Sequence, residues 1–400
     1  MTASGRRVAI LGAARTPIGK FGRALRLTPA VTLGAIAARA ALERAHVAAA
    51  EVPEVLFGQC ITAGCGQNPA RQVLEAAGIP DSAGAATVNM VCGSSMKALQ
   101  IADAEIRSGQ FDLVLVGGME SMDSAPFLVS PRARWGLRYG ADVLDDAMQR
   151  DALVDAYGEH EQMGFTGERI AQKLGLTRRD VDAFAVRSHS RAAMALQQGK
   201  FVAETVPVAP ELSATGEGLT RDEGPRGEST LESLGKIRPA FTPSGILTAG
   251  NSSQLSDGGA ALLLASEEEA HRRGASPLAW IHSGAVGGVR PSDVMEAPIP
   301  TVRRHLERTG LRPSDFDRVE HNEAYASASI AVQRAFAFTD DQFNVNGGAI
   351  ALGHPIGATG ARIVVTLLYE LLRAKGRLGL ATLCMGGGNG LSLILDRREL

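Results

Sequence analysis

Two stretches of the chain, residues 88–118 and 343–388, repeat the same order of features. In the first, a turn of small residues leads to a helical run and then to the apolar strand 112–116, which ends at Gly117 and Gly118. In the second, a turn rich in Asn and Gly leads to a helical run near 358–372 and then to an apolar strand from 378, which ends in three glycines. This repeated order predicts two related halves.

Short apolar runs alternate with helical patterns in the N-terminal part of the chain. Val8–Leu11, Val55–Cys60 and Leu113–Val116 are typical of buried strands, and Ser94–Ser108 has the apolar spacing of a helix that ends at Gly109. Such alternation favours an α/β fold with a parallel or mixed sheet covered on both faces. The chain has 400 residues, of which 45% are hydrophobic, so it can build more than one domain.

The material between the two repeated stretches is different. Residues 121–250 are rich in polar turns and contain one clear helix, which begins at a capping box of Thr177 and Asp180 and ends at Gly199. Residues 209–235 are rich in Gly, Glu, Ser and Thr and are expected to be a loop. We therefore predict an N-terminal half (1–120, completed by 251–272), an inserted substrate-binding lobe (121–250) and a C-terminal half (273–400).

Composition excludes several classes of protein. The net charge is −2 and no long basic stripe occurs, which argues against a nucleic-acid partner. Four cysteines in so long a chain indicate a reducing compartment rather than a disulfide framework. The first apolar run is too short for a signal peptide and no run is long enough to cross a membrane. We expect a cytoplasmic protein without a membrane partner.

Cys92 is the first candidate for chemistry. It precedes Gly93, Ser94 and Ser95 at the start of the expected helix, where the helix dipole favours a thiolate and lowers the pKa of the thiol. The alternative is an inert cysteine in the core, because free cysteines are often buried. The residue alone favours neither reading.

Two later positions strengthen the case for catalysis. His354 precedes Pro355 and lies between Gly353 and Gly357, a stiff turn that can hold an imidazole as a base. The alternative is a histidine that caps the following helix. Cys384 ends an apolar strand before three glycines, whose backbone N–H groups suit an anion or a developing oxyanion. The alternative there is a plain strand end followed by a flexible turn.

Other signals are weaker. Asn322 is expected to be the N-cap of a helix that runs through Phe336, which is compatible with a catalytic role. Its neighbours His321 and Glu323 are expected to be structural. Cys60 and Cys65 have no companion pair, so no metal site is predicted.

Together these residues resemble the thiolase family, especially the biosynthetic acetyl-CoA acetyltransferases. The resemblance runs nearly the whole length of the chain. It rests on the segments Arg15–Lys20, Val91–Ser94, Gly117–Met122, Thr248–Asn251, Asn322–Ala324, Asn344–Gly360 and Cys384–Gly388. It implies a thiolase-like fold of two similar α/β halves, in which layered mixed sheets enclose helices, plus the inserted lobe. The Pro126–Asp146 stretch resembles the loop that forms tetramers, so a homotetramer, a dimer of dimers, is expected.

The resemblance also implies a mechanism. His354 would activate Cys92, which takes an acyl group from acyl-CoA in a covalent, ping-pong reaction. Cys384 would remove a proton from a second acetyl-CoA, and the carbanion would attack the acyl group on Cys92. His354 and a water held by Asn322 would stabilise the enolate oxygen, and the N–H groups of Cys92 and Gly386 the tetrahedral oxyanion. The substrates would be acetyl-CoA, acetoacetyl-CoA and CoA, with no metal or redox cofactor.

The resemblance places coenzyme A on the inserted lobe. Ser253 would contact pantetheine, and Arg226 and Ser233 the nucleotide end. Met163, Phe241, Ala249 and Tyr325 would line the thioester tunnel. Two departures occur: the family often has His-Met-Gly where this chain has Gln162-Met163-Gly164, with His160 two residues earlier, and Asn-Glu-Ala-Phe where this chain ends in Tyr325. Either Gln162 or His160 would take the place of the family's histidine, and the Tyr325 hydroxyl could change which acyl chain fits.

Three readings follow. The first is an acetyl-CoA C-acetyltransferase that joins two acetyl-CoA molecules or cleaves acetoacetyl-CoA. The second is a 3-ketoacyl-CoA thiolase of fatty-acid breakdown that accepts longer chains. The third, disfavoured by the intact set of Cys92, His354, Cys384 and Asn322, is a silent CoA- or lipid-binding relative.

Overall fold

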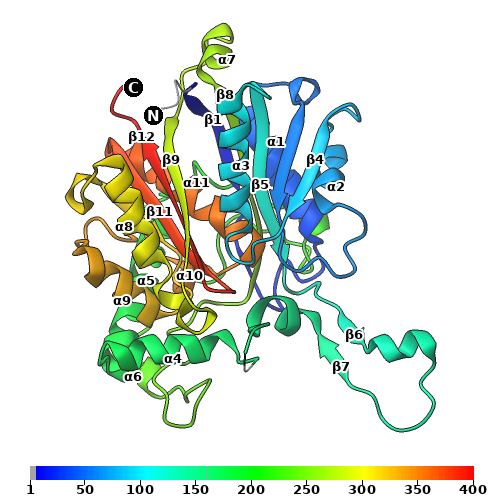
Figure 1. The fold of residues 1–400 in the computed structure, drawn as a ribbon, viewed down its shortest axis with the longest axis vertical. Coiled ribbons are helices and arrows are strands. Elements are labelled where there is room, and N and C mark those ends of the chain that lie inside the picture. The colour runs from blue at the N-terminus through cyan, green and yellow to red at the C-terminus, as the bar shows by residue number, and fades with distance from the viewer. Residues whose placement is uncertain (1–5, 159) are drawn as a thin grey trace.

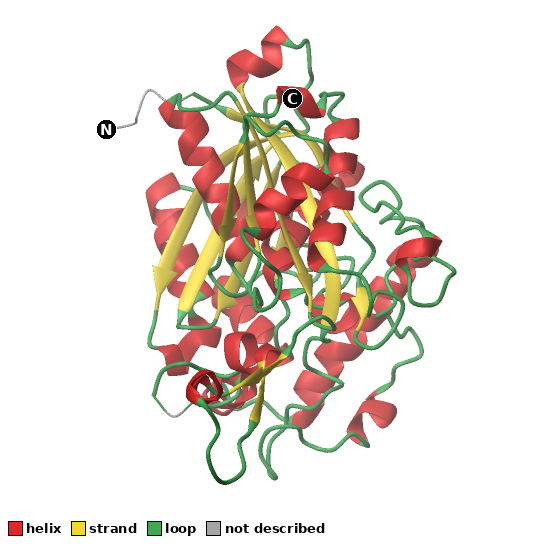
Figure 2. Cartoon of the chain, turned by 90° about the vertical axis from the view of Figure 1, so that its right-hand side faces the viewer, coloured by secondary structure: helices red, strands yellow, loops and turns green. Residues whose placement is uncertain are grey.

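The computed structural model describes residues 6–158 and 160–400, which form a mixed α/β fold (Figures 1 and 2). The strands are β1 Val8–Arg15, β2 Gly19–Lys20, β3 Glu54–Gly58, β4 Gly84–Val88, β5 Leu113–Ser121, β6 Phe127–Val129, β7 Leu144–Asp146, β8 Ser256–Ser266, β9 Ala279–Gly288, β10 Arg318–His321, β11 Leu378–Met385 and β12 Asn389–Asp396. The helices are α1 Ala30–Arg44, α2 Pro69–Ala76, α3 Ser94–Ser108, α4 Met163–Lys173, α5 Arg178–Gln197, α6 Leu231–Gly235, α7 Glu267–Arg272, α8 Pro298–Thr309, α9 Ala326–Phe336, α10 Ala349–Leu352 and α11 Thr359–Ala374.

The two halves have the same strand topology. In the N-terminal half the neighbours run β4-β3-β5-β8-β1, which is the order 3-2-4-5-1 when the strands are numbered along the chain. The C-terminal half runs β10-β11-β12-β9, and Phe343, which bridges Val319 of β10, takes the place of the third strand. In both halves the first pairings are parallel and the later ones antiparallel. The predicted pair of similar halves is confirmed.

The helices form layers around these sheets. α3 and α11 lie between the two halves, and their apolar side chains form one core with strands from both. α1 and α2 cover the outer face of the N-terminal half, and α8 packs on the outer face of the C-terminal half (Figure 1). The halves join where β1 pairs with β9 over Val8–Ile10. Because α3 and α11 are equivalent in the two halves, the residues just before them, Cys92 and His354, also occupy related positions.

The connection between β5 and β8 carries the inserted material. It includes α4, α5, α6 and a ribbon of β6 and β7 that projects from the body (Figure 1). The expected helix from Thr177 is α5, and its capping box is present. Among the described residues, no helix is both long and apolar enough to cross a bilayer.

Three expectations about local structure were wrong. The insertion was expected to contain one clear helix, but it contains α4 and α6 besides α5. Because α6 lies within residues 209–235, this stretch is not all loop. α4 contains two glycines, which weaken helix propensity, and it is stabilised by packing instead: Gly164 contacts Phe241, and Gly167 contacts Tyr325. Strand β3 ends at Gly58, before Cys60.

Asn322 does not cap a helix. α9 begins at Ala326, and its N-cap is Tyr325. The backbone of Asn322 continues the sheet, because its N–H donates to the Thr382 carbonyl at 3.1 Å. A bridge between Ser252 and Tyr325 keeps the following residues extended, which delays the start of the helix.

Candidate active site

Cys92 stands at the entrance to α3 on a strained turn. Val91, the residue before it, has a φ of 49°, which is unusual for a β-branched residue. The Ser94 hydroxyl fixes this turn, since it donates to the Val91 carbonyl at 2.6 Å and accepts from the Met90 N–H at 2.9 Å. Backbone strain of this kind is found where a side chain must be held for a function. The turn leaves the Cys92 side chain half-buried.

His354 faces the Cys92 thiol. Its Nε2 lies 3.3 Å from the Cys92 sulfur, and its Nδ1 lies 2.7 Å from the Thr359 hydroxyl. That hydroxyl donates to the Pro355 carbonyl at 2.8 Å, so it must accept a proton from Nδ1. The Nε2 lone pair therefore points at the thiol, which is the tautomer that a base for Cys92 requires. Thr359 was not among the predicted site residues, although it lies in the same Gly-rich segment.

The His354 turn is held by a buried carboxyl group that the sequence analysis did not single out. Glu120, at the end of β5, accepts the N–H groups of Cys60 at 3.0 Å, Ile61 at 3.1 Å and Gly357 at 2.7 Å. It thereby joins three segments that are distant in sequence. Burial raises the pKa of Glu120 to about 7. In the sequence, Glu120 could have been noticed because it lies in the Gly117–Met122 segment, which is one of those that resemble the thiolase family.

Cys384 ends β11 and is buried beside Met295. The two sulfurs are 3.7 Å apart. The following turn of residues 386–388 connects β11 to β12, and Gly387 and Gly388 have φ values of 82° and 83°, which favour glycine. This turn places Gly386 on the same cavity as Cys92, and the Gly386 N–H acts to lower the pKa of that thiol. The N–H groups of Gly386 and Cys92 are thus two donors beside one thiol.

Cys92, Cys384 and His354 are all neutral at rest, because burial disfavours the charged form of each side chain. Burial, then the neighbouring Cys384, raises the pKa of Cys92 to about 12, and burial likewise raises the pKa of Cys384 to about 12. Burial, then the positive charge of Arg362, lowers the pKa of His354 to about 3. The expectation that the pKa of Cys92 would be lowered was wrong, because the loss of hydration on burial outweighs the two N–H donors that favour the thiolate.

These groups share one small cavity. It has a volume of about 50 Å³ and is lined by Cys92, His354, Cys384, Gly386, Met163, Ser253 and Tyr325, with apolar side chains such as Leu153, Val294 and Met295. An adjoining cavity of about 170 Å³ is lined by Gln162 and Phe241 and shares Leu153, Met163, Ser253 and Tyr325 with the first. The pair forms an apolar path that ends at two thiols and an imidazole. We call them the inner and the outer cavity.

Asn322 carries the least satisfied amide near this site. It is fully buried after β10, and neither its Oδ1 nor its Nδ2 has a partner among the described residues. A buried amide without partners costs free energy unless a water or a ligand completes it. Asn322 is therefore available to hold a water, although its side chain does not line the inner cavity.

The remaining predicted positions lie elsewhere. The Arg226 N–H and guanidinium both lie 3.2 Å from ring nitrogens of His189, and Ser233 closes a capping box with Thr230 at the start of α6. Neither they nor Ala249 line the inner or the outer cavity. Gln162 lines the outer cavity, whereas His160 is exposed and contacts the Asp155 carbonyl at 3.1 Å.

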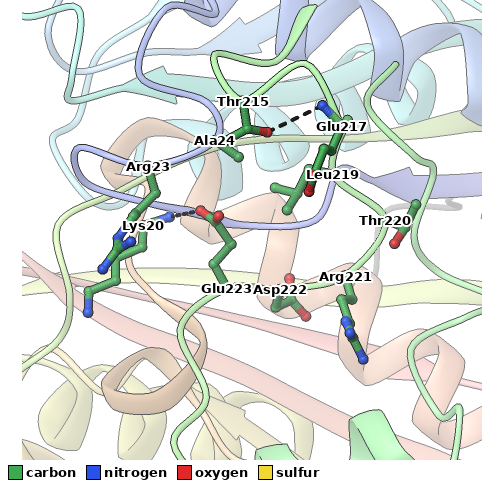
Figure 3. A pocket seen from close by; sticks show the side chains of 11 residues that line it. Lys20, Arg23, Ala24, Thr215, Glu217, Leu219, Thr220, Arg221, Asp222 and Glu223 are labelled. Atoms are coloured by element: carbon green, nitrogen blue, oxygen red, sulfur yellow. Dashed lines mark hydrogen bonds between the residues drawn. The ribbon is translucent and has the colours of Figure 1, made fainter. Parts of the chain in front are cut away.

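A larger cavity, of about 580 Å³, is lined by other residues than the inner cavity, and Figure 3 shows its lining side chains. It opens between residues 20–24 and 215–223, and its lining mixes cations such as Lys20, Arg23 and Arg221 with acids such as Glu217 and Glu223. No predicted site residue lines it. Its size alone does not make it the reactive site, since neither cysteine nor histidine occurs among its described lining residues.

Comparison with known proteins agrees with this geometry. The chain matches the family model described as thiolase, N-terminal domain, over residues 8–268, and that described as thiolase, C-terminal domain, over residues 275–397. An acetyl-CoA acetyltransferase of Escherichia coli K12 is 44% identical, and the match covers 97% of this chain and 98% of the relative. Proteins of the same name from Pseudomonas aeruginosa PAO1 and Shinella zoogloeoides are each 46% identical, covering 98% and 97% of this chain and 99% and 98% of the relatives. Because the two family models span most of the chain and the relatives match it over nearly their whole length, this chain belongs to the thiolase family.

Proposed function

We propose that this chain is an acetyl-CoA C-acetyltransferase, which condenses two acetyl-CoA molecules to acetoacetyl-CoA and CoA and catalyses the reverse thiolysis. The observation that carries the proposal is the contact of 3.3 Å between His354 Nε2 and the Cys92 sulfur, in a cavity that also holds Cys384. The names of the relatives support the same substrates.

In the first half-reaction, Cys92 is the nucleophile. Its sulfur attacks the thioester carbonyl while His354 Nε2 takes the thiol proton. The N–H groups of Cys92 and Gly386 stabilise the oxyanion, and each such donor lowers the activation free energy by about 3 kcal/mol. The tetrahedral adduct collapses, the CoA sulfur leaves with the proton from His354, and the acyl group remains on Cys92.

In the second half-reaction, Cys384 acts as a thiolate after its proton passes to His354, which lines the same cavity and is neutral again once CoA has left. It takes a proton from the methyl carbon of a second acetyl-CoA, and the carbanion attacks the acyl group on Cys92. The new carbon–carbon bond forms as the bond to Cys92 breaks, so one thiolate is consumed and another is released. The proton held by His354 then passes to the Cys92 thiolate, which restores the starting state with all three groups neutral. We assign the enolate oxygen to His354 and to a water on the Asn322 amide, because that buried amide has no partner among the described residues. None of these steps requires a metal or a redox cofactor.

The size of the inner cavity favours a short acyl group. About 50 Å³ beside Cys92 leaves room for few heavy atoms, and the apolar lining suits an alkyl end rather than a charged one. We assign Met163, Ser253 and Tyr325 to the thioester and Gln162 and Phe241 to pantetheine, because these residues line the two connected cavities. Arg226, Ser233 and Ala249 lie outside both cavities, so the nucleotide contacts of Arg226 and Ser233 rest on the family resemblance alone.

The test is CoA-dependent loss of acetoacetyl-CoA by the wild type and by Cys92→Ala, Cys384→Ala and Cys65→Ala. Both active-site variants should lose activity by several orders of magnitude, as expected for a nucleophile and an essential base. Cys65→Ala is the matched control, since this thiol lies outside both cavities, and it should remain active.

Mass spectrometry of the protein after acetyl-CoA treatment separates the two thiols. Cys384→Ala should still form acetyl-Cys92, and Cys92→Ala should not. Acetylation at another residue, or an active Cys92→Ala, would refute the mechanism. Faster cleavage of long-chain 3-ketoacyl-CoAs than of acetoacetyl-CoA would refute the short-chain assignment.

We further propose a homotetramer built through the ribbon of β6 and β7. Large apolar side chains are exposed along it, including Phe127, Trp135, Tyr139 and Leu144. Contiguous exposed apolar surface of this kind marks an association site. Sedimentation should give four copies for the wild type and fewer for Trp135→Glu; an unchanged mass would contradict this role of the ribbon.

A further inference from the structure

Tyr325 stands where the inner and the outer cavity meet. It lines both of them, together with Leu153, Met163 and Ser253. Any acyl group that passes from the outer cavity to Cys92 must therefore pass this side chain. The inner lining is otherwise mostly apolar, which makes a phenol at this point conspicuous.

The Tyr325 ring is fixed in one orientation. A Cβ added to Gly167 of α4 would lie 3.0 Å from the ring's Cγ and 3.1 Å from its Cδ2, so the base of the ring packs closely on α4. Phe241 packs edge-on at 5.7 Å between ring centroids, a favourable aromatic arrangement. The ring lies in the inner cavity together with Cys92 and Cys384, which line the same space.

The hydroxyl has no partner within the part of the chain that the structure describes. The Tyr369 hydroxyl, by contrast, accepts from Arg44 at 3.3 Å and donates to the Ala13 carbonyl at 2.8 Å. A phenolic O–H inside a protein normally finds an acceptor. In the free protein, a water in the cavities can accept this hydrogen bond. An acyl group that displaces the water removes the acceptor.

We propose that the Tyr325 hydroxyl is a specificity-determining group that selects a two-carbon acyl unit at Cys92 by penalising longer alkyl chains. This inference rests on the proposed function and deepens it. An acetyl group leaves space for a water on the hydroxyl. A longer chain takes the place of that water, offers no acceptor, and leaves the buried O–H unpaired.

The experiment compares Tyr325→Phe with the wild type, using kcat/KM for CoA-dependent cleavage of acetoacetyl-CoA and of 3-oxohexanoyl-CoA. Phenylalanine keeps the ring that packs on Gly167 and Phe241, so the fold should be retained. The ratio of the longer to the shorter substrate should rise about tenfold, the effect of relieving one unpaired buried donor. Tyr369→Phe is the matched control, because Tyr369 is a half-buried tyrosine that lines neither cavity, and its ratio should not change.

A second readout does not depend on cleavage. The rates at which acetyl-CoA and hexanoyl-CoA acylate Cys92 are followed by mass spectrometry, and the hexanoyl rate should gain on the acetyl rate in Tyr325→Phe. An unchanged ratio in both assays would overturn the selection. An equal fall for both substrates would also overturn it, because the hydroxyl would then act in the chemistry. If the wild type cleaves neither substrate and forms no acyl-Cys92, the proposed function itself fails. The wild-type measurements show this before any variant is compared.

Discussion

Replacing Thr359 with valine would remove the hydroxyl that sets the proton on His354. In the wild type this hydroxyl lies 2.7 Å from Nδ1 and donates to the Pro355 carbonyl at 2.8 Å, so Nδ1 carries the proton and Nε2 faces Cys92 at 3.3 Å. Valine has nearly the same shape as threonine but cannot accept a hydrogen bond from Nδ1–H. The buried Nδ1–H would lose its partner, and the imidazole could turn or adopt the other tautomer, in which Nε2–H faces the thiol.

The magnitude follows from the loss of one buried acceptor. An unsatisfied buried donor costs about 1–3 kcal/mol, which corresponds to a fall in the acylation rate of about 5- to 150-fold. The assay is the rate of CoA release in the first turnover after mixing with acetyl-CoA, because this step precedes any role of Cys384. Thr359→Ser keeps the hydroxyl and is the control; it should acylate at close to the wild-type rate.

An unchanged acylation rate in Thr359→Val would refute the reasoning. So would an equal loss in Thr359→Ser, because the methyl group rather than the hydroxyl would then be responsible. Thermal unfolding of both variants, measured in parallel, shows whether a loss of activity reflects a loss of fold.

Two further predictions concern stability. Glu120→Gln tests the buried carboxyl: its pKa is raised from 4.5 to about 7, so its ionisation opposes folding, and wild-type stability should fall as pH rises through this window. Between about pH 5 and about pH 7.5 the wild type should lose about 2 kcal/mol more than the variant in urea unfolding, and parallel pH profiles would contradict this. Gly360→Ala tests the contact between α11 and α3: the new Cβ would lie 2.4 Å from the Met96 nitrogen, and overpacking of this kind costs about 1–3 kcal/mol. Gly235→Ala is the control, because no atom of the described residues lies within 4 Å of the added Cβ, and this variant should be as stable as the wild type or more so. Equal unfolding midpoints for both variants would refute the contact.

Much of the architecture was visible in the sequence because it depends on local pattern. The apolar run and Gly109 define α3 as Ser94–Ser108, and the glycine-ended strands reveal the two halves. Features that depend on tertiary contact were missed. α4 is stabilised by the aromatic rings that pack on its glycines. Tyr325 rather than Asn322 is the N-cap of α9, because a bridge to Ser252 keeps the preceding chain extended.

In the candidate site, too, features set by local sequence pattern could be predicted, and features set by tertiary contacts could not. The glycines around Cys92, His354 and Cys384 mark tight turns, and the structure brings these three residues together in one cavity. The sign of the pKa shift of Cys92 could not be read from a helix start, because burial decides it. The roles of Thr359 and Glu120 depend on which atoms their oxygens reach, and a sequence does not contain that information.

The two halves differ most in how they connect their last two strands. The N-terminal half places residues 122–255 between β5 and β8, whereas the C-terminal half closes the corresponding gap with residues 386–388. The two halves of the duplicated fold can therefore take different roles. One copy keeps a minimal turn, whose geometry is exacting because its N–H must meet a sulfur, and the other copy is free to lengthen. Insertions and replacements in the lobe can accumulate without moving α3 or α11, so the choice of acyl donor can evolve while the bond-making residues stay in place.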